Sequence, residues 1–463
     1  MSETPTVDAE VRPEAEDQSE TFDRMMREVS DLLERHDMAG LVDYVQELHS
    51  ADIADLIEQL HSDERATFIA ATRGILDAEV FIHLDEIVRD EVLEYLRPEE
   101  LAAVVSELDT DDAVYLIEDM DEADQREVLA AVTPEDRAAL EEGLGYGEDT
   151  AGRLMQRDLI SVPEFWTIGQ TIDYLRETDD LPDEFYEIFV VDPRHRPIGS
   201  VPLNRAMRSK RPVRISEIME AEPRIIPVDM DQEEVAYIFK QYRLTSAPVV
   251  DATGRLIGVI TVDDVVEIIE EEAGEDILRL AGVADDDLFD TVLSTTRTRF
   301  TWLLVNLGTA VLASIVIGLF DATMEQVIAL AVLMPIVASM GGNAGTQTLT
   351  VTVRAIATRD LTSANALRLL NKEFLISLIN GVLFAVLVGL VAWAWFGVPL
   401  LGGVIALAMI INMVIAGISG MLVPMALDRL NIDPAIASSV FVTTITDIVG
   451  FFAFLGLAAL VLL

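Results

Sequence analysis

The sequence contains no cysteine among its 463 residues, so it has neither disulfides nor thiolate metal ligands. Lysine is scarce as well: only Lys210, Lys240 and Lys372 occur, and the other basic residues are arginines. Lys and Arg together number 32 against 81 Asp and Glu, which gives a formal net charge of −49. Such a charge repels nucleic-acid phosphates and argues against nucleic acid as a partner. It suits divalent cations, or a halophilic protein in a salt-rich cytoplasm.

Several chemical signatures are missing too. The sequence has no P-loop, no cluster of His or Cys with metal-ligand spacing, and no visible pairing of a nucleophile with a base. These absences argue against an enzyme and against an ATP-driven pump. The N-terminus also lacks a basic-then-apolar signal segment, so we expect the N-terminal half to stay on the side of the membrane where it is made.

Long apolar stretches occur only in the last part of the chain. From Thr301 onward there are seven acidic and five basic residues, which leaves 74 acids and 27 bases in the first 300 residues. An acidic soluble half therefore precedes a membrane half. Five stretches can each cross a hydrocarbon core of about 30 Å; they cover roughly residues 300–320, 326–353, 374–396, 400–427 and 434–463. The basic residues flank them on one side only, which predicts a cytoplasmic N-terminal half and an outside C-terminus.

The first part of the soluble half is helical by its periodicity. Residues 1–20 are polar and acidic, and we expect them to be disordered. Residues 21–147 carry apolar residues at spacings of three and four, and a phrase such as His49-Ser-Ala-Asp-Ile-Ala-Asp-Leu recurs from Asp109. Short repeated helices of this kind predict an α-helical solenoid.

The pattern then changes to a duplicated α+β unit. Short β runs at 188–191 and 247–250 are each followed by Asp and a turn, and each turn leads to a second strand. The predicted domains after the solenoid are the two copies at 148–211 and 212–272, a connector helix at 273–297 and a five-helix transmembrane domain at 298–463. The chain is therefore expected to be a multidomain, multi-pass membrane protein.

The last apolar stretch contains one carboxylate, Asp447. A charge at membrane depth is costly, so it is expected to face a partner or a water-filled path. On a helix, Thr443, Asp447 and Gly450 share one face, which offers a hydroxyl, a carboxylate and an open backbone. This set suits a hydrated hard cation; the alternative is a carboxylate buried for helix packing.

The second apolar stretch is unusually rich in small and polar residues. Its run from Met334 to Thr348 holds one Pro, three Gly and several amides and hydroxyls. Small residues allow close helix packing, whereas Asn343 and Gln347, one turn apart, favour a polar pore lining; both roles are compatible. Asn412, in the fourth stretch, is interpreted as an interhelical hydrogen-bond donor rather than an ion ligand.

The duplicated unit resembles a pair of CBS domains. The second copy contains Gly258-Val-Ile-Thr261-Val-Asp-Asp264, which is similar to the phrase that contacts ribose and phosphate in that family. In the first copy Pro202 and Arg205 replace the hydroxyl and the acid. The resemblance implies ATP as a candidate ligand near Thr261 and Asp264, and a pure dimerisation hinge is the alternative.

The whole order of parts resembles the MgtE family of magnesium channels. The motifs that carry the resemblance are the His49 phrase, Pro335-Ile-Val-Ala-Ser-Met-Gly-Gly-Asn-Ala-Gly-Thr-Gln, and Asn431-Ile-Asp-Pro-Ala with Thr443-Thr-Ile-Thr-Asp. The resemblance implies a homodimer in the cell membrane that takes up Mg²⁺ through one pore and is closed by intracellular Mg²⁺. A coupled divalent-cation carrier or exchanger is the alternative, and a nucleotide or salt sensor is a more distant one.

The resemblance also implies roles for particular residues. Asp447 matches the pore carboxylate, Thr443 and Gly450 match positions with backbone carbonyls nearby, and Asp433 matches an acid at the cytoplasmic mouth. Candidate regulatory metal ligands are Asp264, Glu267, Glu275, Asp276, Asp109, Asp111 and Asp112. Halophilic surface charge is the alternative explanation for each of these regulatory acids.

Overall fold

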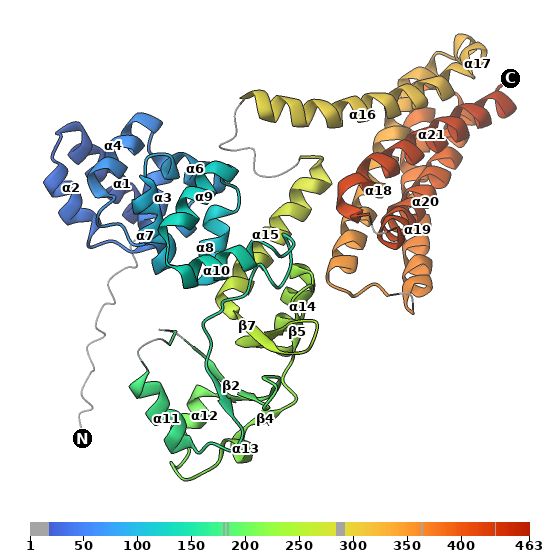
Figure 1. Cartoon of the computed structure of the whole chain (residues 1–463). Coiled ribbons are helices and arrows are strands. Elements are labelled where there is room, and N and C mark those ends of the chain that lie inside the picture. Colours follow the sequence, from blue (N-terminus) through green and yellow to red (C-terminus); the bar gives the residue numbers. More distant parts are fainter. Residues whose placement is uncertain (1–17, 179–180, 183–184, 284–291, 363, 431) are drawn as a thin grey trace, which may run out of the picture. The chain divides into compact units, whose positions relative to one another are not determined.

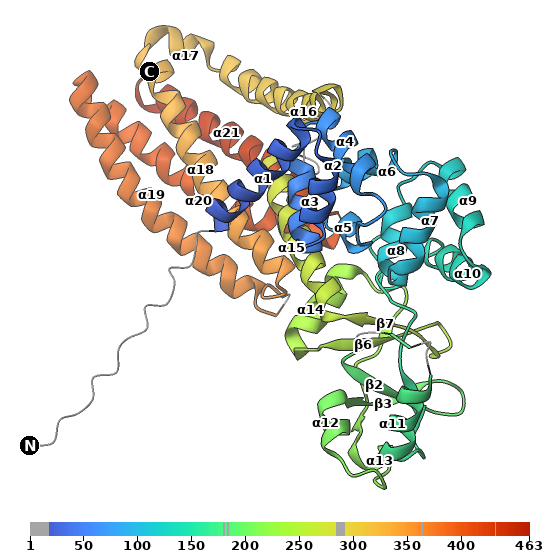
Figure 2. The same cartoon turned by 90° about the vertical axis from the view of Figure 1, so that its left-hand side faces the viewer.

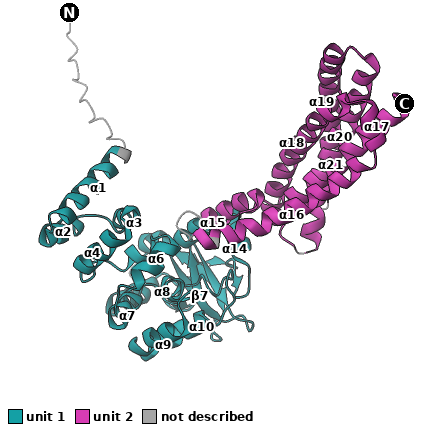
Figure 3. Ribbon diagram, turned by 90° about the horizontal axis from the view of Figure 1, so that it is seen from above, with its two compact units in different colours: residues 1–268 teal, residues 269–463 magenta. Residues whose placement is uncertain are grey.

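The computed structural model describes residues 18–178, 181–182, 185–283, 292–362, 364–430 and 432–463. The chain divides into two compact units, Met1–Ile268 and Ile269–Leu463 (Figure 3). Most of the predicted disordered tail lies outside the described residues, although Gln18 to Glu20 begin the first helix.

Ten short helices open the described part of the first unit (Figure 1). Contacts run mainly to the next helix but one, as α2 with α4, α3 with α5, α7 with α9 and α8 with α10, which is how stacked repeats bury their apolar faces. Side-chain caps fix several helix starts: Asp85 accepts from the backbone N–H of Ile87 at 3.1 Å, and Thr133 from that of Asp136 at 3.2 Å. The helical prediction is confirmed, with α1 Gln18–Glu34, α2 Met38–Val45, α3 Ser50–Gln59, α4 Ser62–Thr72, α5 Glu79–Ile82, α6 Glu86–Leu93, α7 Pro98–Glu107, α8 Thr110–Ile117, α9 Glu122–Ala131 and α10 Pro134–Gly143.

Two small sheets with matching geometry follow. In each, a short strand pairs in parallel with a buried strand, which then pairs antiparallel with the next strand. The sheets share an irregularity at the end of the buried strand, at Val191 and at Val250, so the predicted duplication is confirmed. The strands are β1 Ser161–Pro163, β2 Glu187–Val191, β3 Pro197–Pro202, β4 Glu220–Ala221, β5 Ile226–Pro227, β6 Ser246–Val250 and β7 Leu256–Thr261; the helices are α11 Ile168–Glu177, α12 Leu203–Arg208, α13 Ile215–Ile218 and α14 Gln232–Tyr242.

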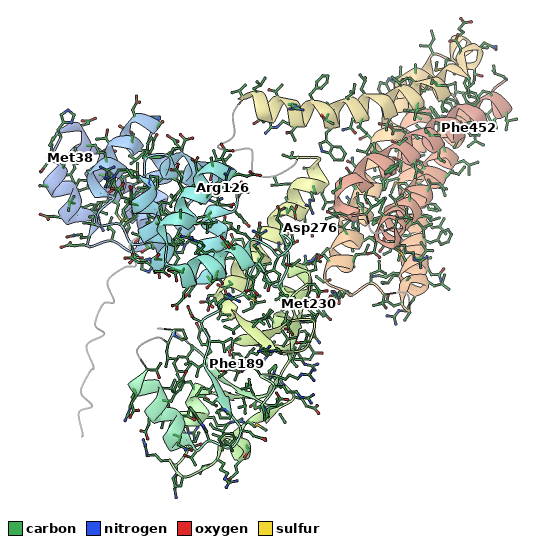
Figure 4. All side chains as sticks on the ribbon, in the orientation of Figure 1. Met38, Arg126, Phe189, Met230, Asp276 and Phe452 are labelled. Atoms are coloured by element: carbon green, nitrogen blue, oxygen red, sulfur yellow. The ribbon has the colours of Figure 1, made fainter. Side chains whose placement is uncertain are left out.

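The two repeats exchange their opening segments. β4 lies in the predicted second copy, yet it pairs with β3 of the first sheet. Conversely, Ala151 and Met155 of the predicted first copy are buried in the core of the second, and Gln156 exchanges backbone hydrogen bonds of 2.8 and 2.9 Å with Val259. Each core therefore needs both copies. Figure 4 labels Phe189 of the first sheet, which packs against the strand β7 of the second.

The connector differs from the predicted single helix. α15, Val262–Ala281, begins inside the second repeat and continues into the membrane unit without a break. Residues 284–291, with the Asp285-Asp-Asp287 run, lie outside the described residues, and at Val292 the first membrane helix begins. The described parts of the predicted connector thus belong to two helices.

The second unit is a helical bundle. α18, α20 and α21 lie side by side and α19 packs on α20 (Figures 1 and 2). Small residues allow close approach: a Cβ on Gly402 would lie 2.6 Å from the carbonyl oxygen of Gly389. Within the described residues, five helices are long and apolar enough to span a membrane, as predicted. They are α16 Val292–Gly318, α18 Ala329–Ala357, α19 Ala366–Phe396, α20 Pro399–Arg429 and α21 Pro434–Val461, with the short α17 Asp321–Gln326 between the first two.

Candidate cation pathway and regulatory acids

Asp447 lies in the middle of α21 and is half-buried. α21 starts at Pro434 because Pro suits the first helical turn and Asp433 caps the helix, accepting from the backbone N–H of Ala435 at 2.7 Å. Thr443, one turn before Asp447, is exposed, whereas Thr446 is fully buried. Among the described residues no Lys, Arg or His forms an ion pair with Asp447. Its charge must be balanced by a proton, a second copy of the chain or a mobile cation.

Gly450 differs from the expectation of an open backbone. It is buried, and a Cβ at this position would lie 2.7 Å from the side-chain nitrogen of Asn412. Asn412 is fully buried, and its amide donates to the carbonyl of Val337 at 2.8 Å, which confirms its interpretation as an interhelical donor. The same side chain fills the space beside Gly341 of α18. A larger residue would not fit at Gly450 or Gly341, because the Asn412 side chain lies between their helices.

The second membrane helix has two different faces. α18 is continuous through Pro335, and its face with Gly341 and Gly345 packs on α20 and α21. Asn343 and Gln347 point away from this contact and are exposed. One face thus packs closely, while another presents amides at membrane depth.

Both carboxylate oxygens of Asp433 accept hydrogen bonds from other parts of the chain. One carboxylate oxygen caps α21, and the other accepts from the guanidinium of Arg279 in α15 at 2.7 Å. Arg279 also pairs with Glu275 one turn earlier. Burial, and then the charge of Asp433, raises the pKa of Asp276. Sequence reasoning missed Arg279, because the pairing joins residues 154 positions apart.

The acids of the first domain and of the second repeat meet in the first unit. Burial, and then the charges of Asp264 and Asp112, raises the pKa of Asp111 well above its usual range. Burial first and Asp264 second raise the pKa of Asp112 to about 7, and Asp109 and Glu267 add to this. Asp111 is 8% exposed, and its Oδ1 has no hydrogen-bond partner among the described residues. Five of the predicted regulatory acids are therefore neighbours, which sequence distance alone does not require.

The carboxylates of this acid cluster do not converge on a single metal position. Within the described residues, no three His, Cys, Asp or Glu side chains are arranged to hold a single metal ion. Burial raises the pKa of Asp264 to about 6, although the Thr261 hydroxyl donates a hydrogen bond of 2.6 Å to it. The cluster thus has the charge to attract a cation but needs side-chain movement to chelate one.

A narrow cleft between the two sheets has a volume of about 20 Å³ and is bordered by Thr261. Its lining includes the carboxylates of Asp158 and Glu187 and the aromatic rings of Phe185 and Tyr186, but no Lys or Arg. Triphosphates are normally held by cationic side chains. The lining therefore does not suit a chain of phosphates.

Comparison with known proteins shows which families and relatives this chain is similar to. A model of MgtE divalent cation transporters matches residues 334–457, one of the MgtE intracellular N domain matches 48–149, and one of the CBS domain matches 215–271. The chain is 34% identical over 358 residues to the magnesium transporter MgtE of Thermus thermophilus, covering 76% of this chain and 79% of that protein. It is 29% identical over 357 residues to the magnesium transporter MgtE of Bacillus subtilis, with the same coverage.

Among solved structures, one similar protein is the cytosolic domain of the Mg²⁺ channel MgtE in complex with ATP. It is 31% identical, spans 52% of this chain and 99% of that one, and has a TM-score of 0.48.

Together, the five spanning helices and the matched domains define a multi-pass membrane transporter with an intracellular N domain, and not an enzyme. Within this class, the chain belongs to the MgtE family of divalent cation transporters. The predicted family and the predicted sequence of helical domain, CBS region and five-helix membrane domain are confirmed.

Proposed function

We propose that the protein is a magnesium-selective channel that takes up Mg²⁺ through a pore bordered by Asp447. The observation that carries this proposal is that Asp447 is the one charged residue of α21 and has no ion-pair partner among the described residues. The Mg²⁺ specificity is supported by the names of the relatives. Mg²⁺ loses water reluctantly and is usually bound by one or two carboxylates with several waters retained.

A second copy of the chain would complete this pore. Thr443, Asn343 and Gln347 are exposed in the single chain, so they are free to line a path on a two-fold axis together with two Asp447 carboxylates. Gly450 contributes through its contact with Asn412, which orients α21. The proposal includes a homodimer in the cell membrane, with cytoplasmic N-terminal domains, an outside C-terminus and the domain limits predicted above.

Intracellular Mg²⁺ is proposed to close the channel through the acid cluster. Two like charges 4 Å apart repel by about 4 kcal/mol at an effective dielectric constant of 20. Asp111, Asp112 and Asp264 are packed together in spite of this, so a bound cation stabilises their approach. Glu267 and Asp109 belong to the same cluster, whereas Glu275 and Asp276 lie further along α15 near Asp433.

ATP at the CBS cleft stays a prediction. Thr261 borders the cleft, but its hydroxyl is already bonded to Asp264. Because the lining has no Lys or Arg, we expect adenosine to bind at least as tightly as ATP. Calorimetry with both compounds measures this difference.

The test of the proposed function is Mg²⁺ uptake into liposomes that contain only the purified protein. A channel should pass Mg²⁺ current at a fixed membrane potential without any counter-ion. Flux that requires a proton or sodium gradient would instead identify a coupled carrier or exchanger. No flux under either condition would reject transport by this chain alone.

A further inference from the structure

Both oxygens of the Asp433 carboxylate already accept a hydrogen bond. Its Oδ1 accepts from the backbone N–H of Ala435 at 2.7 Å, and its Oδ2 accepts from Arg279 Nη1 at 2.7 Å. The pair is partly shielded, since the side chains of Arg279 and Asp433 are 35% and 26% exposed. A charge-assisted hydrogen bond in such a place is stronger than an exposed ion pair.

Arg279 is the only basic residue of α15, which otherwise carries eight acids. Arg279 pairs with Glu275 of α15 and with Asp433 of α21, and Asp276 lies close enough to Asp433 to feel its charge. Without Arg279, three carboxylates would repel one another at this position. The guanidinium offsets this repulsion and so helps to hold α15 in place.

The contact also has an apolar part. Leu280, the next residue, packs against Leu349 of α18 and Ala435 of α21, both fully buried. Arg279 and Leu280 together attach the end of α15 to the start of α21, within the second unit. Figure 4 labels Asp276 on the same helix.

We propose that Arg279 is a positioning residue for transport: its guanidinium is a tethered cation that occupies Asp433, so that a permeating Mg²⁺ must displace it before it can load the mouth carboxylate. This inference rests on the proposed function for the identity of the ion. The competition follows from the geometry: Arg279 Nη1 lies 2.7 Å from Asp433 Oδ2, so its positive charge opposes the approach of a second cation to this carboxylate. Loss of Arg279 should therefore free both Asp433 and the end of α15.

A merely structural role makes different predictions. Arg279 lies in the last turn of α15, where a positive charge also stabilises the helix end. That effect does not depend on Asp433, whereas a tethered cation acts only through it. The double variant Arg279→Gln/Asp433→Asn separates the two roles.

The first readout does not require conduction. Because the chain has no cysteine, a single Leu280→Cys substitution gives one labelling site for a maleimide in the full-length protein in liposomes. We expect Arg279→Gln to increase the labelling rate roughly tenfold and Arg279→Lys to change it less than about twofold. The matched control, Glu270→Gln, removes an exposed acid of the same helix and should leave the rate unchanged. In the Asp433→Asn background, Arg279→Gln should have no further effect. Unchanged labelling in Arg279→Gln, or an equal increase in both backgrounds, would overturn the proposal.

The second readout is initial Mg²⁺ influx at low external Mg²⁺ in the same variants without Leu280→Cys. Arg279→Gln should raise influx roughly tenfold, Arg279→Lys should restore the parent rate, and the increase should vanish when Asp433 is Asn. Influx in Arg279→Gln at or below the parent rate contradicts the competition. A parent protein that transports no Mg²⁺ but shows the expected labelling pattern would reject the proposed function and leave Arg279 as the residue that holds α15 to Asp433.

Discussion

At the scale of single residues, two carboxylates lie in surroundings that disfavour a negative charge. Each of them can be tested by a separate experiment. Asp447 sits in an apolar helix without a basic partner among the described residues. Glu118 of the helical domain is partly buried beside Arg153, whose Nη1 donates to it at 2.7 Å. The first residue concerns transport, and the second concerns the stability of the first unit.

Removing the charge of Asp447 should abolish transport. Asp447→Asn keeps the shape of the side chain, so the helix should fold and pack as before, while the attraction for a cation is lost. We expect the Mg²⁺ flux in liposomes to fall by more than about tenfold, a barrier increase of at least about 1.4 kcal/mol. Asp433→Asn, nearer the mouth, should reduce flux less, because water screens that position and Arg279 is released. An Asp447→Asn protein that conducts like the parent would make Asp447 a packing residue.

The pH dependence of stability should change in Glu118→Gln. Burial raises the pKa of Glu118 to about 7, although Arg153 opposes the shift. The folded state therefore holds a proton that the unfolded state releases above its ordinary pKa, so stability falls as pH rises from about 4.5 to about 7. Because Gln does not ionise, the melting temperature of Glu118→Gln relative to the parent should rise between pH 5 and 8. The difference is on the order of 1 kcal/mol after allowance for solvent screening.

Thermal unfolding of the full-length protein in detergent at a series of pH values measures this effect. Glu122→Gln is the matched control, because its carboxylate is 95% exposed. A melting-temperature difference between Glu118→Gln and the parent that stays constant from pH 5 to 8 would show that Arg153, rather than burial, dominates at this site.

At the scale of elements, small residues and polar side chains decide how the membrane helices approach. α18 carries adjacent glycines with opposite surroundings: a Cβ on Gly341 would overlap the Asn412 side chain, whereas a Cβ on Gly342 would meet no atom of the structure within 4 Å. The buried Asn412 side chain thus requires a glycine at position 341 but not at position 342. A substitution of Gly342 is therefore a control for the same substitution of Gly341.

Gly341→Ala should destabilise the bundle, and Gly342→Ala should not. Overpacking of a close contact typically costs about 1–3 kcal/mol, while Ala in place of Gly inside a helix favours the helix by roughly 0.5–1 kcal/mol. Melting temperatures of the two variants in detergent should therefore move in opposite directions relative to the parent. Equal shifts would mean that α18 does not contact Asn412 as the structure shows.

At the scale of the whole molecule, a strongly acidic N-terminal half is connected by α15 to an apolar bundle. Asp111 and Asp112 come from the helical domain, and Asp264 comes from the start of α15. In molar salt the Debye length is about 3 Å, so distant repulsion disappears and only directly adjacent acids matter. Magnesium is thus expected to act on this cluster even in a protein with halophilic composition.

Limited proteolysis of the full-length protein in 1 M KCl should become slower when Mg²⁺ is added. Turning a 1:99 equilibrium into 99:1 takes about 5.5 kcal/mol of differential binding, which a few shared ions can supply. Asp112→Asn should weaken the Mg²⁺ effect, whereas Glu135→Gln, an exposed acid of the same domain, should not. Identical cleavage with and without Mg²⁺ in the parent would reject regulation through this cluster.

Patterns within short stretches of the sequence determined much of the fold of this protein. Helix periodicity, the alternation of short β runs and hydropathy indicated the helical domain, the duplicated sheets and five spans, because each depends on neighbours within about twenty residues. The same holds for Asp447: an isolated carboxylate in an apolar run is visible without any structure. Asn412 was identified as an interhelical donor for the same reason.

Contacts between distant segments were decided only by the tertiary structure. No sequence pattern showed that β4 completes the first sheet, that Gly450 accommodates Asn412, or that Asp111 lies beside Asp264. Arg279 and Asp433 are 154 positions apart, and their pairing depends on how α15 packs on the start of α21. Packing energy depends on which surfaces meet, and the order of residues along the chain constrains that choice only weakly.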